Sequence, residues 1–377
     1  MTTYQTSAAR PSFFSPGAAL LLLLAVIGAG AAVYRIVAGL GATTHLYDQF
    51  PWGHWKQVNV LFGVALSGCG FTMAAVVYIF NLKTYKSLAR PAVLAALAGY
   101  LSVTVTLILD LGKPLAFWHP IVMWQPHSML FEIIWCMMLY TGVLVLELSP
   151  AFLEGIGMNK LAKLMHALMI PFVIAAVTLS FLHQSSLGGI FLLMKGTLSH
   201  LWWTTMLPYN FFLSAIVSAL AVTTIIAYYA ASLNRQEADP KVVQGLAKGT
   251  AWALLVYAVV RLGDMLLKGN LGLAFTGSFA ATFFLLEVAG GVLLPMLLLF
   301  LVGKSKAGIL LGQSLVIAGI LLNRLNVAFF TQAQDGAMYM PSLTEFLLSF
   351  GVVAGAILLF KAGAIYLPIV RQTEAVA

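Results

Sequence analysis

The chain has 377 residues, of which 61% are hydrophobic and only 8% are charged. Soluble globular domains are about 45–50% apolar and about 25% charged, so this composition excludes a soluble enzyme, a nucleic-acid module and a disordered chain. The net charge of +8 comes from lysines and arginines that stand mostly in short loops between apolar runs, so it indicates topology rather than nucleic-acid binding. Cys69 and Cys136 lie inside apolar runs and predict neither a disulfide framework nor a metal site.

Ten apolar runs are long enough to cross a bilayer as helices, because the hydrocarbon core takes about 20 apolar residues per helix. In chain order they are Gly17–Gly39, Gln57–Phe80, Pro91–Asp110, His127–Leu148, Leu164–Leu182, Thr205–Ala230, Thr250–Leu267, Phe279–Val302, Ala307–Phe329 and Thr344–Val370. Residues 1–377 are therefore expected to form a single polytopic, all-α membrane domain. The first run also fits a cleaved signal peptide, whereas an uncleaved helix keeps the number of spans even.

The loop cations predict the orientation of the chain, because cytoplasmic loops carry the excess of lysine and arginine. One side receives Arg10, Lys83, Lys86, Arg90, Lys160, Lys163, Arg235, Lys241, Lys248, Lys304, Lys306 and Arg371. The other side receives only Arg35, Lys56, Lys113, Lys195 and Lys268. Both termini are therefore expected in the cytoplasm.

Histidines gather on the opposite, outer side. Six of the seven fall at or just beyond the predicted outer ends of the spans: His45, His54, His119, His127, His183 and His200. The tryptophans in the same loops fit an ordinary interfacial aromatic belt. The one-sided gathering of histidines favours a functional site at this face.

Ionisable side chains within the predicted spans are costly and are expected to face the bundle interior. The outer half of the membrane is expected to hold Asp110, Glu132, His183, Arg261, Asp264 and Arg324. Arg261 and Asp264 are three residues apart on one helix face, so they are expected to pair. Buried pairs that hold helices together are one explanation of these charges. As a set they favour a site for a quinone head group, because carboxylates and histidine in a low-dielectric setting can exchange protons with it.

Three further charged residues, Glu147, Glu287 and Lys361, continue from this cluster toward the cytoplasmic side. Together with Glu132 they predict a proton relay, since intramembrane acids often mark such routes. A glutamate near a helix end, such as Glu147, also fits a side chain that simply reaches the interface.

An internal repeat is indicated by three pairs of residues at nearly equal intervals. The pairs are Asn59 with Asn210, Asp110 with Asp264, and Glu132 with Glu287. Residues 57–183 would then correspond to residues 205–329 in parallel orientation, because four spans separate them. The expected fold is two four-helix bundles with a flanking helix on either side.

Several runs resemble one known family. They are FPWGHW at Phe50–Trp55, ARPAVLAALAGY at Ala89–Tyr100, SMLFE at Ser128–Glu132, LHQSSLGG at Leu182–Gly189, RLGD at Arg261–Asp264 and MPSLTEFLLSFG at Met340–Gly351. Together they resemble the polysulfide reductase membrane subunits of the NrfD/PsrC type, and within that family the ten-span HybB branch of nickel–iron hydrogenases. The likeness covers nearly the whole chain, about Leu20 to Leu367.

The resemblance implies a membrane anchor subunit of a multi-subunit oxidoreductase in the bacterial cytoplasmic membrane, inactive by itself. It implies a ferredoxin-like iron–sulfur partner on the periplasmic side, which exchanges electrons with menaquinone or ubiquinone. A nickel–iron hydrogenase or a molybdopterin enzyme is the implied catalytic subunit. Such subunits generally carry no haem.

Residues and resemblance together predict a quinone site at Asn59, Asp110, Glu132, His183, Arg261, Asp264 and Arg324. Hydrogenase-type members often have aspartate where Asn59 stands; asparagine can hydrogen-bond a quinone carbonyl but cannot carry a proton. No haem is predicted, although His127 and His183 leave a haem b ligand pair open. Two other functions stay open: a haem-b electron-transfer subunit, and a proton-coupled transporter with mid-span prolines at Pro171 and Pro295.

Overall fold

The computed structural model describes residues 12–48, 50, 52–330, 339–367 and 369. Within these residues ten helices are long and apolar enough to cross a membrane, which confirms the predicted all-α, ten-span architecture. Arg10 and Arg371, which entered the orientation prediction, and Pro51 of the FPWGHW run lie outside the described residues.

Spans two to five form the first four-helix bundle. Span two consists of four segments: the π-helix η1 (Lys56–Phe62), α3 (Gly63–Ser67), α4 (Cys69–Ala74) and the π-helix η2 (Ala75–Ile79). Span three consists of η3 (Lys83–Tyr85) and α5 (Lys86–Asp110), and span four is α7 (Met129–Gly155). Span five consists of α9 (Met169–Ile190) and η5 (Phe191–Met194). Span two is irregular but lies at the centre of the molecule, packed on α5, α9 and the second bundle.

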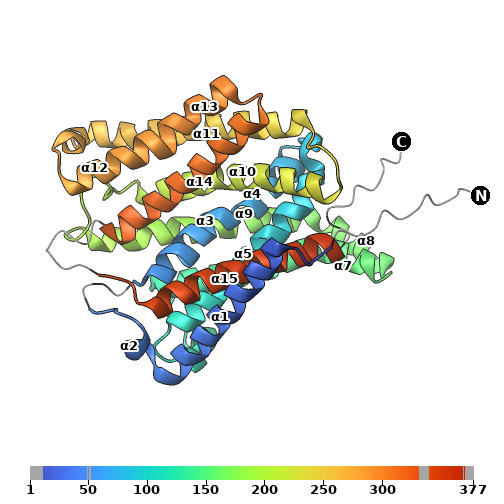
Figure 1. Ribbon diagram of the computed structural model, residues 1–377, viewed down its shortest axis with the longest axis horizontal. Helices are drawn as coiled ribbons and strands as arrows, with labels where there is room; N and C mark the ends of the chain where they lie inside the picture. The colour runs from blue at the N-terminus through green and yellow to red at the C-terminus, as the bar shows by residue number, and fades with distance from the viewer. Residues whose placement is uncertain (1–11, 49, 51, 331–338, 368, 370–377) are drawn as a thin grey trace, which may run out of the picture.

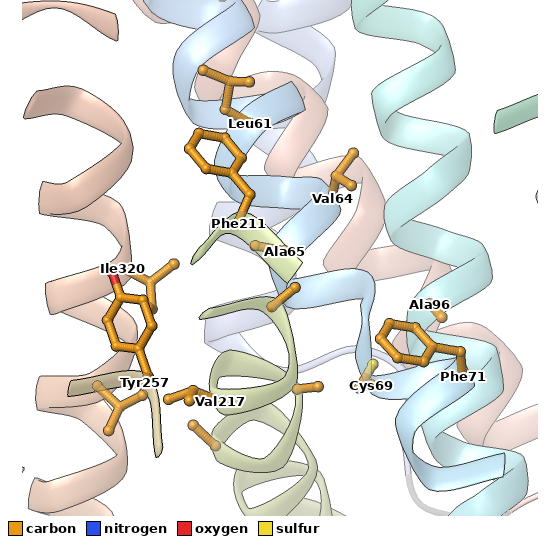
Figure 2. Packing of buried hydrophobic residues seen from close by; sticks show 14 of the residues in the cluster. Leu61, Val64, Ala65, Cys69, Phe71, Ala96, Phe211, Val217, Tyr257 and Ile320 are labelled. Atoms are coloured by element: carbon orange, nitrogen blue, oxygen red, sulfur yellow. The ribbon is translucent and has the colours of Figure 1, made fainter. Parts of the chain in front are cut away.

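Spans six to nine form the second bundle. They are α10 (Leu207–Leu233), α11 (Pro240–Leu267), span eight with α12 (Phe279–Leu285), the π-helix η7 (Leu286–Leu293) and α13 (Leu294–Val302), and α14 (Lys306–Ala328). The bundles meet where α10 packs against α3, α4 and α9. Figure 2 shows Leu61 of span two beside Phe211 of α10 within the continuous apolar core. Ser218 of α10 also donates to the Ala65 carbonyl at 2.9 Å.

The flanking helices α1 (Pro16–Ala38) and α15 (Leu343–Tyr366) pack against each other and against α5 of the first bundle (Figure 1). The expectation of one flanking helix on either side is therefore wrong. A Cβ atom on Gly28 would lie 2.5 Å from the Cα atom of Gly351, so the two backbones touch there. Small residues that permit such close approach favour association of membrane helices, which accounts for the pairing.

The two ends of the helix array differ in composition. At one end, named the histidine-rich end here, the loops carry α2 (Leu40–Thr43), η4 (Pro114–Ala116), α6 (His119–Val122), η6 (Leu271–Phe275) and the residues His45, His54, His119, His127 and His200. The opposite, lysine-rich end carries α8 (Asn159–Ala167) and the residues Lys83, Lys86, Lys160, Lys163, Lys304 and Lys306. Helix α1 begins and α15 ends at the lysine-rich end (Figure 1). The cytoplasmic location of this end stays a prediction.

Glu345 joins two loops at the histidine-rich end. Its fully buried carboxylate accepts the backbone N–H groups of His45 and Ser342, each at 3.1 Å, and the Tyr339 hydroxyl. The Ser342 side chain in turn accepts the Glu345 N–H at 3.2 Å, which completes a capping box at the start of α15. The MPSLTEF run thus ties the last span to the loop after α1.

The contact between α1 and α15 is testable by substitution. Gly28→Leu should separate the two helices and cost about 1–3 kcal/mol, as overpacking usually does. Gly30→Leu is the matched control, because a Cβ atom at Gly30 meets nothing within 4 Å. Thermal unfolding in nanodiscs measures both; equal melting temperatures for the two variants would contradict the close backbone contact.

Candidate functional site

The predicted quinone-site residues do not form one cluster, because their contacts divide them into three groups. Asn59 and Asp110 lie beside the flanking helices, Glu132 and His183 lie within the first bundle, and Arg261, Asp264 and Arg324 lie in the second. Among the contacts of the described residues, no hydrogen bond or ion pair joins one of these groups to another. Each group therefore has to be assessed by itself.

Asn59 links three helices. Its amide nitrogen donates to Thr106 Oγ1 of α5 at 3.2 Å, and its amide oxygen accepts from Ser349 Oγ of α15 at 3.2 Å. All three side chains are buried. The amide nitrogen and the amide oxygen of Asn59 are therefore both engaged in joining η1 to α5 and α15.

Asp110, the last residue of α5, is likewise engaged by protein groups. It forms an ion pair with Lys56 at 2.6 Å and accepts the Trp55 indole N–H at 2.8 Å. Nearby, Arg35 of α1 donates to the Leu111 carbonyl at 2.6 Å. These bonds hold the ends of α1, α5 and span two together at the histidine-rich end.

Arg261 pairs with Glu287 of η7, not with Asp264 as predicted. Asp264 instead forms an ion pair with Lys268 at 2.9 Å and accepts the Thr204 hydroxyl at 2.5 Å. The reason is depth: Arg261 points into the buried core, whereas Asp264 lies near the end of α11, where a half-exposed lysine one turn further on can reach it.

Glu287 is the centre of a buried network in the second bundle, with a side chain only 1% exposed. Besides Arg261, its carboxylate accepts Trp202 Nε1 at 2.8 Å, Asn323 Nδ2 at 2.8 Å and Asn326 Nδ2 at 2.6 Å. A buried charge is tolerated when it is paired and hydrogen-bonded in this way. These bonds join α11, α14, η7 and the loop before α10, so Glu287 has the geometry of a packing residue.

Arg324 completes this network without a carboxylate of its own among its described contacts. Its guanidinium lies 3.7 Å from the centre of the Phe211 ring and donates to Ser214 Oγ at 2.8 Å and Asn323 Oδ1 at 2.6 Å. A cation over an aromatic face is stabilised by the ring quadrupole. Arg324 is therefore held by this stacked arrangement and by polar bonds, and not by an ion pair among the described residues.

A small pocket opens at the histidine-rich end of the second bundle, beside this network. Arg261, Asp264, Asn210 and Trp202 are among the residues that line it. Arg261 Nη2 and Asn210 Oδ1 find no hydrogen-bond partner among the described residues. Buried polar atoms of this kind are usually bonded to ordered water.

The ion pair in the second bundle gives a stability prediction. Arg261→Met leaves the Glu287 carboxylate buried without its cation and should destabilise the fold by about 3–5 kcal/mol. Lys268→Met is the control, because that partly exposed pair is worth at most about 1 kcal/mol. Thermal or denaturant unfolding in detergent compares them, and similar losses in the two variants would contradict the central place of Glu287.

His183 is fully buried in the first bundle and not at an outer helix end, which corrects the prediction. Helix α9 continues through the LHQSSLGG run to Ile190, because its two glycines stand in the last turn and no proline interrupts the run. His183 and Ser186 share one face of α9, and Ser186 Oγ donates to Glu132 Oε1 at 2.8 Å. Glu132 stands in the first turn of α7, where the helix dipole stabilises a negative charge.

Two tyrosines extend this group inward. The rings of His183 and Tyr100 are 5.7 Å apart between centroids, and those of Tyr100 and Tyr140 are 4.6 Å apart. Both ring nitrogens of His183, both tyrosine hydroxyls and both carboxylate oxygens of Glu147 find no hydrogen-bond partner among the described residues. The backbone of Ile133, the Ser180 hydroxyl and the backbone of Phe71 lie near His183, Tyr100 and Tyr140 respectively, whereas Glu147 has no such neighbour among the described residues. Buried polar atoms in native proteins are almost always bonded, so these protein groups, water or a ligand would satisfy this line.

The spacing along α7 places these groups on one side of the helix. Glu132, Cys136, Tyr140 and Glu147 follow one another at intervals of four, four and seven residues, which share a helix face. At a rise of 1.5 Å per residue they cover about 22 Å along the axis. We call this set the α7 polar face. It runs through most of the depth of a bilayer core.

At the lysine-rich end, the α7 polar face leads to three charged side chains. Glu154 accepts Arg90 Nη2 at 3.0 Å and pairs with His166 Nε2 of α8 at 2.8 Å. Tyr78 lies within electrostatic reach of both Glu147 and Arg90. Polar groups therefore follow one another from Glu132 to the opposite end of the first bundle.

Sequence reasoning missed Tyr100, Tyr140 and Ser186. The eight-residue interval from Glu132 to Tyr140 was a usable signal, since it keeps both on one helix face. Tyr100 and Ser186 meet the others only through the packing of α5 and α9 on α7. Lys361 of the predicted relay lies elsewhere: it donates to Ser15 Oγ at 3.0 Å, at the start of α1.

The described histidines do not offer a bis-histidine haem site. Only His183 among them is buried, whereas His127 is exposed in the loop before α7. A haem b held between two membrane helices needs two facing histidines. The described histidines therefore do not fit this group.

The ten helices of the described residues that are long and apolar enough to cross a membrane define the class of the protein as a multi-pass integral membrane protein. A family model described as "Polysulphide reductase, NrfD" matches residues 42–334. The chain belongs to this family.

Three relatives are similar over most of their length. A protein of Nitratidesulfovibrio vulgaris is 34% identical over 375 residues, covering 96% of both chains. The "Probable Ni/Fe-hydrogenase 2 b-type cytochrome subunit" of Escherichia coli is 31% identical, covering 85% of this chain and 84% of the relative. The "Menaquinone reductase, integral membrane subunit" of N. vulgaris is 28% identical, covering 90% and 88%.

Proposed function

We propose that the chain is the quinone-interacting membrane anchor subunit of a multi-subunit oxidoreductase. It passes electrons between a peripheral iron–sulfur subunit and the quinone pool. The observation that carries the proposal is the line of unpartnered polar atoms at His183, Tyr100 and Tyr140, which begins beside Glu132. The name of the menaquinone reductase relative supports it further.

The quinone head group binds, in this proposal, between α7 and α9 at Glu132, Ser186 and His183. A quinone supplies two-electron chemistry in which two protons are taken up or released. The unpartnered nitrogens of His183 can donate to or accept from a head-group oxygen, and Glu132 can exchange a proton near it. Ser186 orients the Glu132 carboxylate through the 2.8 Å bond. The Tyr100 ring packs beside the His183 ring, with 5.7 Å between the centroids.

Protons follow the α7 polar face in this proposal. The hydroxyls of Tyr100 and Tyr140 and the carboxylate of Glu147 have no protein partners in the described part of the chain, so they can bind a file of water molecules. The route continues to Glu154 at the lysine-rich end. A proton-transfer role for Glu287 and Lys361 stays a prediction, and this route does not require either residue.

The remaining predicted site residues take a packing role in the proposal. Asn59, Asp110, Arg261, Asp264 and Arg324 hold neighbouring helices together through the bonds described above. The iron–sulfur partner docks at the histidine-rich end, because Glu132 and Ser186 lie nearer to that end of the first bundle than to the lysine-rich end. A nickel–iron hydrogenase or a molybdopterin enzyme completes a complex whose histidine-rich end faces the periplasm of a bacterium, with both termini in the cytoplasm.

Substitutions at the site test the proposal. Glu132→Gln and His183→Ala should each lower quinone-linked electron transfer about 100-fold in the purified complex, the usual worth of a general acid or base. Glu237→Gln is the matched control on an exposed residue and should leave the rate unchanged. Size-exclusion chromatography checks that the complex assembles. Full electron-transfer activity in either Glu132→Gln or His183→Ala would contradict the assignment of the quinone site.

The proton route has its own test. Glu147→Gln removes the titratable group at the middle of the route and should slow proton uptake from the lysine-rich side. The measurement is the change of lumenal pH in proteoliposomes during quinone turnover. Lys361→Met serves as the control. Unchanged proton uptake in Glu147→Gln, together with reduced uptake in Lys361→Met, would favour the relay through span ten instead.

The haem alternative is tested by the absorption spectrum. We expect the purified chain to show no stoichiometric Soret band, because the described part of the chain has one buried histidine and not two. A Soret band with a reduced α-peak that disappears in His183→Ala would instead assign the chain as a haem-b electron-transfer subunit.

A further inference from the structure

Helix α8 lies outside the ten spans, in the connection between α7 and α9. It has nine residues, Asn159–Ala167, and projects from the helix array at the lysine-rich end (Figure 1). Because it connects two membrane-crossing helices, it has to lie at the boundary of the bilayer. Its surface is therefore presented to the headgroup layer, to water or to a partner.

The sequence of α8 separates apolar from basic residues on opposite faces. Leu161, Leu164, Met165 and Leu168 follow the i, i+3, i+4, i+7 spacing of one helix face. Lys160 and Lys163 are three residues apart and fall on the other side. The helix contains no acidic residue.

The apolar face of α8 is not covered by the protein. Leu164 is 52% exposed, Leu161 39% and Leu168 38%. Ile156 and Met158, just before the helix, are 55% and 49% exposed. An apolar surface of this kind next to a bilayer is the feature of helices that lie in the membrane interface.

Contacts with α7 fix the rotation of α8 about its axis. Ala162 is buried, and His166 bonds to Glu154 of α7, which also binds Arg90 of α5. The side that carries Ala162 and His166 is therefore occupied by the protein. The exposed leucines therefore face away from α7 and from the rest of the protein.

We propose that α8 is an interfacial helix that binds anionic phospholipid in the leaflet at the lysine-rich end. Its leucines enter the upper part of the acyl chains, and Lys160 and Lys163 contact the phosphate groups. Two observations favour lipid over a protein partner: the basic face has no acid of its own to neutralise it, and the helix is held at bilayer level by the spans on both sides. The proposal does not depend on quinone chemistry.

Site-directed fluorescence tests the depth of the leucine face in the full chain reconstituted in nanodiscs. Leu164→Cys is labelled with a polarity-sensitive fluorophore; the native Cys69 and Cys136 are buried and stay unlabelled. Ala167→Cys, which is exposed on the basic side, is the matched control. We expect doxyl-labelled lipid to quench the label at 164 at least threefold more than at 167, and aqueous iodide to show the opposite order.

The headgroup preference is tested by changing lipid and charge. In nanodiscs of phosphatidylcholine with about one third phosphatidylglycerol, the doxyl quenching at 164 should exceed that in pure phosphatidylcholine. The double variant Lys160→Gln, Lys163→Gln should lose this difference, whereas Lys304→Gln, Lys306→Gln, at the same end, should keep it.

Two results would overturn the proposal. Equal iodide quenching at 164 and 167 in both lipids would mean that the leucine face is in water. Protection of position 164 that appears only when the partner subunits are present would assign the face to a protein contact instead of lipid.

Discussion

In a bilayer core a buried polar group cannot form hydrogen bonds to bulk water. The stability of the helix array therefore depends on how each buried polar side chain finds its hydrogen-bond partners. In the second bundle the Glu287 carboxylate is satisfied by protein groups alone, from Arg261, Trp202, Asn323 and Asn326. The first bundle leaves His183, Tyr100, Tyr140 and Glu147 without protein partners in the described part of the chain. The two bundles therefore differ in how far protein groups satisfy their buried acids: Glu287 is fully engaged, whereas Glu147 is not.

The paired acidic residues of the candidate repeat therefore lie in two different environments. Glu132 and Glu287 occupy corresponding places in the candidate repeat, as do Asp110 and Asp264. Glu132 has a serine beside it and a half-exposed position near a helix start, whereas Glu287 is fully buried in a π-helix with a guanidinium against it.

Hydropathy was sufficient for the ten spans, because the bilayer sets helix length and each span satisfies its own backbone. Side-chain partners were not predictable in this way. Arg261 stands three residues from Asp264, yet its partner comes from span eight. His183 follows a long apolar run and was placed at its end, but the helix continues for two further turns. Tyr100 reaches His183 only because α5 and α9 both pack around span two.

The backbone contact between Gly28 and Gly351 joins the first and the last membrane helix of the chain. During synthesis, α1 enters the bilayer long before its principal partner α15 exists. Until then its leucine-rich surface and the small residues around Gly28 can face only lipid or the insertion machinery. The principal contact of α1 therefore forms only when α15 is made, and a chain that stops before residue 343 leaves the first helix with its contacts to α5 and the Leu111 carbonyl but without those to α15.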